Sequence, residues 1–181
     1  MNSSSDEMAA FGLFHIVFTN LETHLAVAAF RMCKPKDPDL TFGEVFQRRF
    51  SDKLKLFEEE LERFGSDHTN AVAVRLYAQN ISILRQTCGV IKELAAWRNE
   101  RVHSRVFLTE HGYELYGSKT EKRLEMSYAH IEAKRQEAIK AICDIEGCVG
   151  ELAQVTKWEA EFDKLFSGLR DDADSDAFKE V

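Results

Sequence analysis

The two prolines of this chain, Pro35 and Pro38, lie close together, and no proline follows them before the last residue, Val181. Proline interrupts a helix because it lacks the amide donor and its ring clashes with the preceding turn. Long helices are therefore allowed on both sides of a single loop. Over most of the chain, apolar residues recur every three or four positions, which is the spacing of one helix face. Together these features predict an all-α protein.

The first two helices are predicted from capping signals and apolar spacing. The first begins near residues 5–6, where serine and aspartate are good N-caps, and runs to about Met32. The second follows a capping box formed by Thr41 and Glu44. Its apolar face continues without interruption to Gly65, a typical C-terminal stop.

The third helix is predicted from about Ala71, and a long apolar stripe defines it. The stripe comprises Tyr77, Ile81, Leu84, Cys88, Ile91 and Ala95. Extending it by one step leads to Arg98. Since core-facing positions are normally apolar, an arginine at this step makes the end of the helix unusual.

The pattern changes between residues 104 and 120. Residues 106–109 and 113–116 are rich in β-branched and aromatic side chains. They flank Glu110-His111-Gly112, where the glycine suits a tight turn. This arrangement predicts a small β-hairpin.

A fourth helix is predicted to start near Glu121 or Ser127 and to reach about Phe166, with Gly147 or Gly150 as the place for a break. Four long amphipathic helices favour an antiparallel four-helix bundle, with the β-hairpin between helices three and four. We expect this domain to occupy residues 1–170. The acidic tail, residues 171–181, is expected to be disordered.

Composition excludes several functional classes. The net charge of −7 argues against non-specific coating of nucleic acid or of anionic membranes. The four cysteines include no CxxC pair and are interpreted as reduced, small hydrophobic residues. No signal peptide and no apolar run long enough for a bilayer were found, so we expect a cytoplasmic protein without membrane contact.

Three polar residues near the end of the third helix form the candidate site. Asn99 and His103 continue a ridge of four-residue steps, which places them on one helix face, and the long side chain of Arg98 can reach the same place. The stripe directs this group toward the core. Buried polar groups are costly unless they are paired, so they need a partner, an interface or a cleft.

These residue types suit cleavage of RNA. A histidine can take a proton from the 2′-OH or give one to the leaving oxygen. An arginine can hold the phosphate and stabilise the charge that builds on it. An asparagine can orient either group. Because the 2′-OH is the nucleophile, no metal or cofactor is required.

The segment Arg98-Asn99-Glu100-Arg101-Val102-His103 resembles the Rx4–6H signature of the HEPN superfamily, in which a polar residue often follows the arginine. The resemblance implies a four-helix bundle, commonly a homodimer, that acts as a metal-independent endoribonuclease in toxin–antitoxin, defence or RNA-processing systems. It implies that Arg98 and His103 are catalytic and that Asn99 supports them. It further implies a composite cleft between two protomers and an antitoxin or regulatory protein as partner.

Other interpretations remain open. Arg101 and Arg105 are candidate RNA-binding residues, whereas Arg98 and His103 would be ordinary helix-end cations in a non-catalytic module. Such a module would dimerise and bind a partner protein, nucleotide or RNA. A di-iron centre would need two Glu-x-x-His motifs, and only Glu100-x-x-His103 is present, so we expect no metal.

Overall fold

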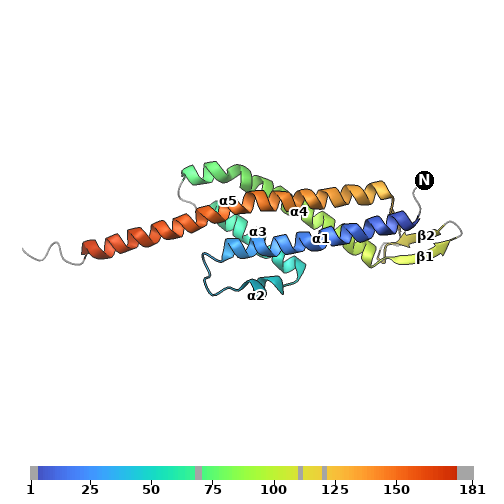
Figure 1. The fold of residues 1–181 in the computed structure, drawn as a ribbon, viewed down its shortest axis with the longest axis horizontal. Helices are drawn as coiled ribbons and strands as arrows, with labels where there is room; N and C mark the ends of the chain where they lie inside the picture. Colours follow the sequence, from blue (N-terminus) through green and yellow to red (C-terminus); the bar gives the residue numbers. More distant parts are fainter. Residues whose placement is uncertain (1–3, 68–70, 110–111, 120–121, 175–181) are drawn as a thin grey trace, which may run out of the picture.

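The computed structural model describes residues 4–67, 71–109, 112–119 and 122–174, and in them the protein is mostly helical with one small sheet (Figure 1). The helices are α1 (Ser4–Cys33), α2 (Phe42–Phe46), α3 (Phe50–Asp67), α4 (Ala71–Val102) and α5 (Tyr128–Asp174). The strands are β1 (Arg105–Thr109), β2 (Gly112–Tyr116) and β3 (Arg123–Leu124). The prediction of a mostly helical protein is confirmed, as are the starts of α1 and α4.

The core lies between the long helices. Helix α1 packs along α5 and also contacts α2 and α3, while α4 packs against α5 and α3 (Figure 1). The largest fully buried side chains come from all four long helices and include Phe14, Leu21 and Leu25 of α1, Phe57 and Leu61 of α3, Leu84, Ile91 and Leu94 of α4, and Ile131 and Leu152 of α5. Their three- and four-residue spacing explains why these segments are helical.

The prediction of one helix from residue 42 to Gly65 is wrong, because the chain forms α2 and α3 with a turn at residues 47–49. The capping box at Thr41 is present. Two aromatic contacts with α1 explain the turn: Phe42 meets Phe30, and Phe50 meets Phe18. Phe18 and Phe30 are twelve residues apart on α1, which is about 18 Å along the helix, whereas the eight residues from Phe42 to Phe50 would span only about 12 Å in one unbroken helix. The turn allows both contacts to form.

The predicted hairpin is present, and it belongs to a three-stranded antiparallel sheet of order β1-β2-β3. Arg105 pairs with Tyr116 and Phe107 with Glu114 across β1 and β2. The predicted turn residues 110–111 lie outside the described part of the chain. Strand β3 was not predicted, and it pairs Leu124 with Leu115, whose side chain joins the core.

Helix α5 begins directly after Ser127, whose hydroxyl accepts a hydrogen bond from the amide of His130 at 3.4 Å. This is one of the two predicted starts. The helix passes Gly147 and Gly150 without a break and continues past Phe166 to Asp174. The predicted tail therefore begins as helix, and residues 175–181 lie outside the described part.

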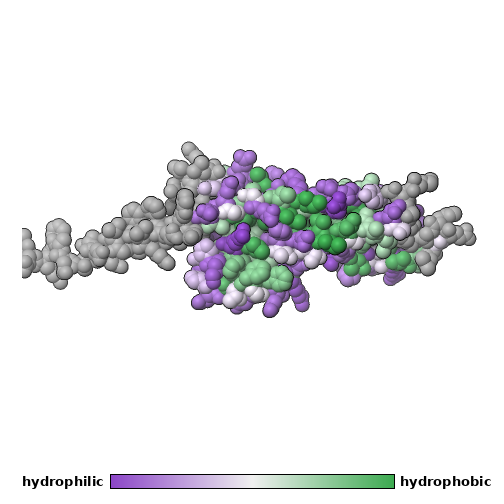
Figure 2. All heavy atoms as spheres, in the orientation of Figure 1, coloured by the Kyte–Doolittle hydropathy of each residue, from purple (hydrophilic) through white to green (hydrophobic). Residues whose placement is uncertain are grey.

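Helix α1 is long and apolar enough to span a membrane by length and composition, contrary to the expectation from the sequence. A core helix of a globular protein can have the same length and composition. In α1, 39% of the most apolar 18-residue stretch is buried within the protein. Its outer face carries Met8, Leu13 and Ile16, each more than half exposed. Hydrophobic residues gather over α1 and the neighbouring part of α5 in Figure 2.

Three of the four free cysteines, Cys33, Cys88 and Cys148, are buried in the described part. Burial raises the pKa of Cys33 to about 11 and that of Cys88 to about 12. Because the thiolate is the reactive form, these two thiols are unreactive near neutral pH.

Candidate functional site

The predicted site residues lie together at the C-terminal end of α4. The amide of His103 donates to the carbonyl oxygen of Asn99 at 3.1 Å, so helical spacing persists one residue beyond Val102. Arg98 Nη1 donates to Asn99 Oδ1 at 3.1 Å. The structure thus joins Arg98 to Asn99 directly and places His103 one turn further along the chain.

The inward face of α4 differs from the predicted one in this last section. Leu94 is fully buried, Trp97 packs against Phe14 with ring centroids 4.9 Å apart, and Arg101 is only 8% exposed. The core stripe therefore follows residues 94, 97 and 101. Asn99 and His103 are exposed, which corrects the expectation that they point toward the core. Their exposure leaves both side chains accessible to a ligand.

Arg98 lies half-buried at the boundary between core and solvent. Its guanidinium carbon is 5.4 Å from the ring centroid of Phe18 on α1, a cation–π distance. Its Nε is the only buried side-chain nitrogen or oxygen of the described, non-exposed residues without a hydrogen-bond partner. The Nη1 bond to Asn99 is the one hydrogen bond of this guanidinium within the described chain. An arginine so weakly paired retains donors for an anion.

His15 of α1 is a neighbour of Arg98 that sequence reasoning did not assign to the site. It lies one turn before Phe18, half-buried, with its ring edge-to-face on Phe11 at 4.9 Å. Burial, and then the positive charge of Arg98, lower the pKa of His15. The ring is therefore neutral near pH 7 and able to accept a proton. No local signal connects it to α4, because 83 positions separate it from Arg98.

Arg101 is a structural residue in this fold. Its Nη2 and Nε donate to the carbonyl oxygen of Glu125 at 3.1 and 3.4 Å, and its guanidinium carbon lies 4.1 Å from the ring centroid of Trp97. Burial lowers the pKa of Arg101 below the usual arginine range. This placement argues against the RNA-binding role predicted for Arg101, since the guanidinium holds the segment that leads into α5.

A second contact ties α4 to the start of α5. Trp97 Nε1 donates to His130 Nε2 at 3.0 Å, and the two rings are stacked with centroids 5.8 Å apart. His130 Nδ1 lies 3.7 Å from a carboxylate oxygen of Glu125. Because Trp97 Nε1 is a donor, His130 Nε2 is the acceptor and Nδ1 carries the proton. The contact fixes the end of α4 on which the site lies.

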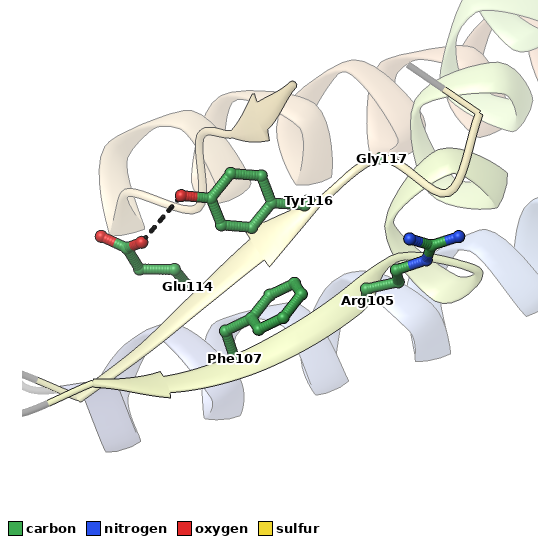
Figure 3. A pocket seen from close by; sticks show the side chains of 5 residues that line it. All are labelled: Arg105, Phe107, Glu114, Tyr116 and Gly117. Carbon is green, nitrogen blue, oxygen red and sulfur yellow. Dashed lines mark hydrogen bonds between the residues drawn. The ribbon is translucent and has the colours of Figure 1, made fainter. Parts of the chain in front are cut away.

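Arg105, the other predicted RNA-binding residue, is exposed at the start of β1. It lines a pocket of about 450 Å³ with Phe107, Glu114, Tyr116 and Gly117 (Figure 3). Only Ser104 separates it from His103, so the Cα atoms of Arg105 and His103 are at most about 7 Å apart. The pocket thus begins beside the end of α4.

No group of three or more His, Cys, Asp or Glu side chains in the described ranges is arranged to hold a metal ion. Comparisons with family models, with curated proteins and with solved structures find no match to this chain. The resemblance to HEPN proteins consequently rests on residues 98–103 and stays a prediction.

Proposed function

We propose that this protein is an endoribonuclease of the HEPN type, with Arg98 and His103 as the catalytic pair and Asn99 as their support. The observation that carries the proposal is the Arg98–Asn99 hydrogen bond beside an exposed histidine at the end of α4. The four long helices α1, α3, α4 and α5 are compatible with the four-helix bundle that the resemblance implies.

The proposed chemistry uses each group according to its surroundings. Asn99 orients the guanidinium of Arg98, whose remaining donors bind the scissile phosphate and stabilise its developing charge. His103 is exposed and exchanges a proton with the 2′-OH or with the leaving oxygen. The 2′-oxygen bonds to phosphorus, the P–O5′ bond breaks, and the 5′-oxygen takes a proton. The products are a 2′,3′-cyclic phosphate and a 5′-hydroxyl.

One histidine at the end of α4 has to serve as base and as acid, and a second copy of the motif would separate these roles. We therefore propose a homodimer, with the outer apolar face of α1 in the interface. Met8, Leu13 and Ile16 are exposed on this face. His15 beside them contacts Phe11 and Phe14, which also contact Trp97, the residue before Arg98. Apolar patches of this kind commonly mark protein interfaces.

Cleavage of single-stranded RNA should persist in EDTA and should stop when a 2′-deoxyribose replaces the scissile ribose. The reason is that the nucleophile is the 2′-OH and the phosphate charge is stabilised by Arg98. Gel analysis of the products should find a 2′,3′-cyclic phosphate or its opened form. Cleavage that is lost in EDTA, or that continues at the deoxy position, would contradict the proposal.

The variant Ile16→Arg should shift the protein from dimer to monomer in light scattering, because an arginine would be desolvated at the centre of the apolar face. Ser82→Arg introduces the same charge at an exposed position of α4, about 24 Å along the helix from Arg98, and should remain dimeric. A wild-type protein that is monomeric at high micromolar concentration would refute the composite site.

The same exposed face of α1 supports the second candidate, a non-catalytic module that binds a partner protein. That candidate predicts Ile16-dependent association without cleavage of any RNA. The EDTA and deoxyribose assay separates the two functions, since only the ribonuclease yields a cyclic phosphate.

A further inference from the structure

One face of the hairpin presents an arginine, two aromatic rings and a carboxylate at adjacent positions (Figure 3). Arg105 and Phe107 alternate with Val106, so both point to the same side of β1. The register sets Arg105 opposite Tyr116 and Phe107 opposite Glu114. Side chains that are directly opposite on antiparallel strands lie about 5 Å apart at Cβ. The four side chains therefore form one continuous surface.

Phe107 gives this surface an aromatic platform. Its side chain is 50% exposed, and its ring meets Tyr116 edge-to-face at 5.3 Å with an interplanar angle of 89°. The contact holds the Phe107 ring while much of the ring stays accessible to solvent. Half-exposed aromatic rings on a small sheet are suited to stacking of unpaired nucleobases.

Glu114 gives the surface a fixed acceptor. Its Oε2 accepts a hydrogen bond from the Tyr116 hydroxyl at 3.0 Å, and Arg123 Nη2 lies 3.3 Å from Oε1. This hydrogen bond raises the pKa of the Tyr116 phenol, which stays protonated as a donor. A carboxylate offers about four acceptor positions, so each oxygen of Glu114 can still accept an N–H from a ligand.

We propose that this hairpin surface binds an unpaired guanine base of RNA, stacked on Phe107 with its donor edge toward Glu114. Among the four RNA bases, guanine carries two neighbouring N–H donors, N1–H and N2–H, that can pair with the two oxygens of one carboxylate. Arg105 binds the adjoining phosphate, on the side of the pocket nearest His103. A pocket of about 450 Å³ is within the range for small ligands and accommodates a base.

The proposal rests on the proposed ribonuclease function for its RNA substrate, and it names the base that lies beside the scissile phosphate. Binding is tested separately from cleavage with fluorescently labelled 2′-O-methyl RNAs of eight residues. Each RNA carries a single guanine, adenine, cytosine or uracil at its centre, and the other central positions are abasic. The 2′-O-methyl group removes the nucleophile, so the oligonucleotides bind without reacting. Fluorescence anisotropy gives Kd for each base.

The guanine oligonucleotide should bind most tightly. Phe107→Ala should raise its Kd about 5- to 150-fold, equivalent to the ~1–3 kcal/mol of one base–aromatic stacking contact. Phe107→Trp should retain binding. Val106→Ala is the matched control, since it truncates an exposed neighbour on the opposite face of β1 and should leave Kd unchanged. Glu114→Gln should reduce the preference for guanine, because its amide offers one acceptor in place of two.

Several results would overturn the inference. These are no binding by wild type, equal Kd for the four bases, or a Phe107→Ala protein that binds like wild type. Equal weakening by Val106→Ala would also overturn it. If binding depends on Phe107 but no RNA is cleaved, the hairpin site stands and the ribonuclease proposal fails. If wild type and Phe107→Ala both cleave RNA without base preference, the ribonuclease proposal stands and the hairpin site fails.

Discussion

His103→Ala should lower the rate of RNA cleavage by about 10²–10⁴-fold, the usual contribution of a general acid or base. The thermal unfolding midpoint should stay close to that of wild type, because the side chain is exposed beyond the last turn of α4 and has no core contact to lose. Initial rates on a fluorescent RNA and unfolding followed by circular dichroism measure the two quantities on the same preparation.

His24→Ala is the matched control for this experiment. His24 is also a histidine of a helix surface, but it lies on α1 nine residues beyond His15 and faces Glu146 of α5 at 3.2 Å. Its removal should leave cleavage unchanged. If His103→Ala cleaves as fast as wild type, the histidine has no part in the reaction. If His24→Ala is equally impaired, the loss reflects the fold and not the site.

Helix formation was the part of this fold that the sequence predicted well, since periodic spacing is a local signal. The stripe through Leu84, Cys88 and Ile91 was read correctly as buried. The apolar spacing gave no indication of the turn between α2 and α3. The apolar spacing from Val45 through Phe50 to Leu54 continues across residues 47–49, so it predicts one helix. Only the positions of Phe18 and Phe30 on α1 require the turn.

The candidate site was predictable to a smaller extent. The sequence predicted that Arg98 and Asn99 act together, but it gave no means of distinguishing Arg98 from Arg101. A stripe that advances by three or four residues can step from Ile91 to Ala95 and then Arg98, as predicted, or to Leu94 and then Trp97. The structure takes the step to Trp97, and this choice brings Arg101 inward and leaves Asn99 and His103 exposed.

The contribution of α1 could not be predicted at all. Arg98 contacts Phe18, and its charge acts on His15, only because the end of α4 lies against α1 in space. Strand β3 is similarly non-local: two residues carry no periodic signal, and the pairing of Leu124 with Leu115 depends on the preceding hairpin. Both features are tertiary contacts, and their effect is to place a neutral histidine and a stable sheet beside the polar end of α4.

The two neighbouring arginines of α4 should respond to substitution in opposite ways. Arg101→Met should lower the free energy of unfolding by about 2–4 kcal/mol, because the carbonyl of Glu125 loses its charged donor and Trp97 loses its cation–π partner. Methionine retains an unbranched apolar stem and removes the guanidinium, so the loss reports mainly on these contacts. Urea denaturation followed by tryptophan fluorescence and circular dichroism measures it.

Arg98→Lys should show the opposite response. The variant keeps the positive charge near Phe18, and the one internal hydrogen bond that it affects is with exposed Asn99, so stability should change by less than about 1 kcal/mol. Cleavage should fall about 10²–10³-fold, because an ammonium group cannot present a planar pair of donors to Asn99 and the phosphate together. If Arg98→Lys cleaves RNA at the wild-type rate, residue 98 contributes only its positive charge and not the geometry of the guanidinium. Wild-type stability of Arg101→Met would mean that the guanidinium does not hold the entry to α5, and Arg101 would again be free to contact RNA.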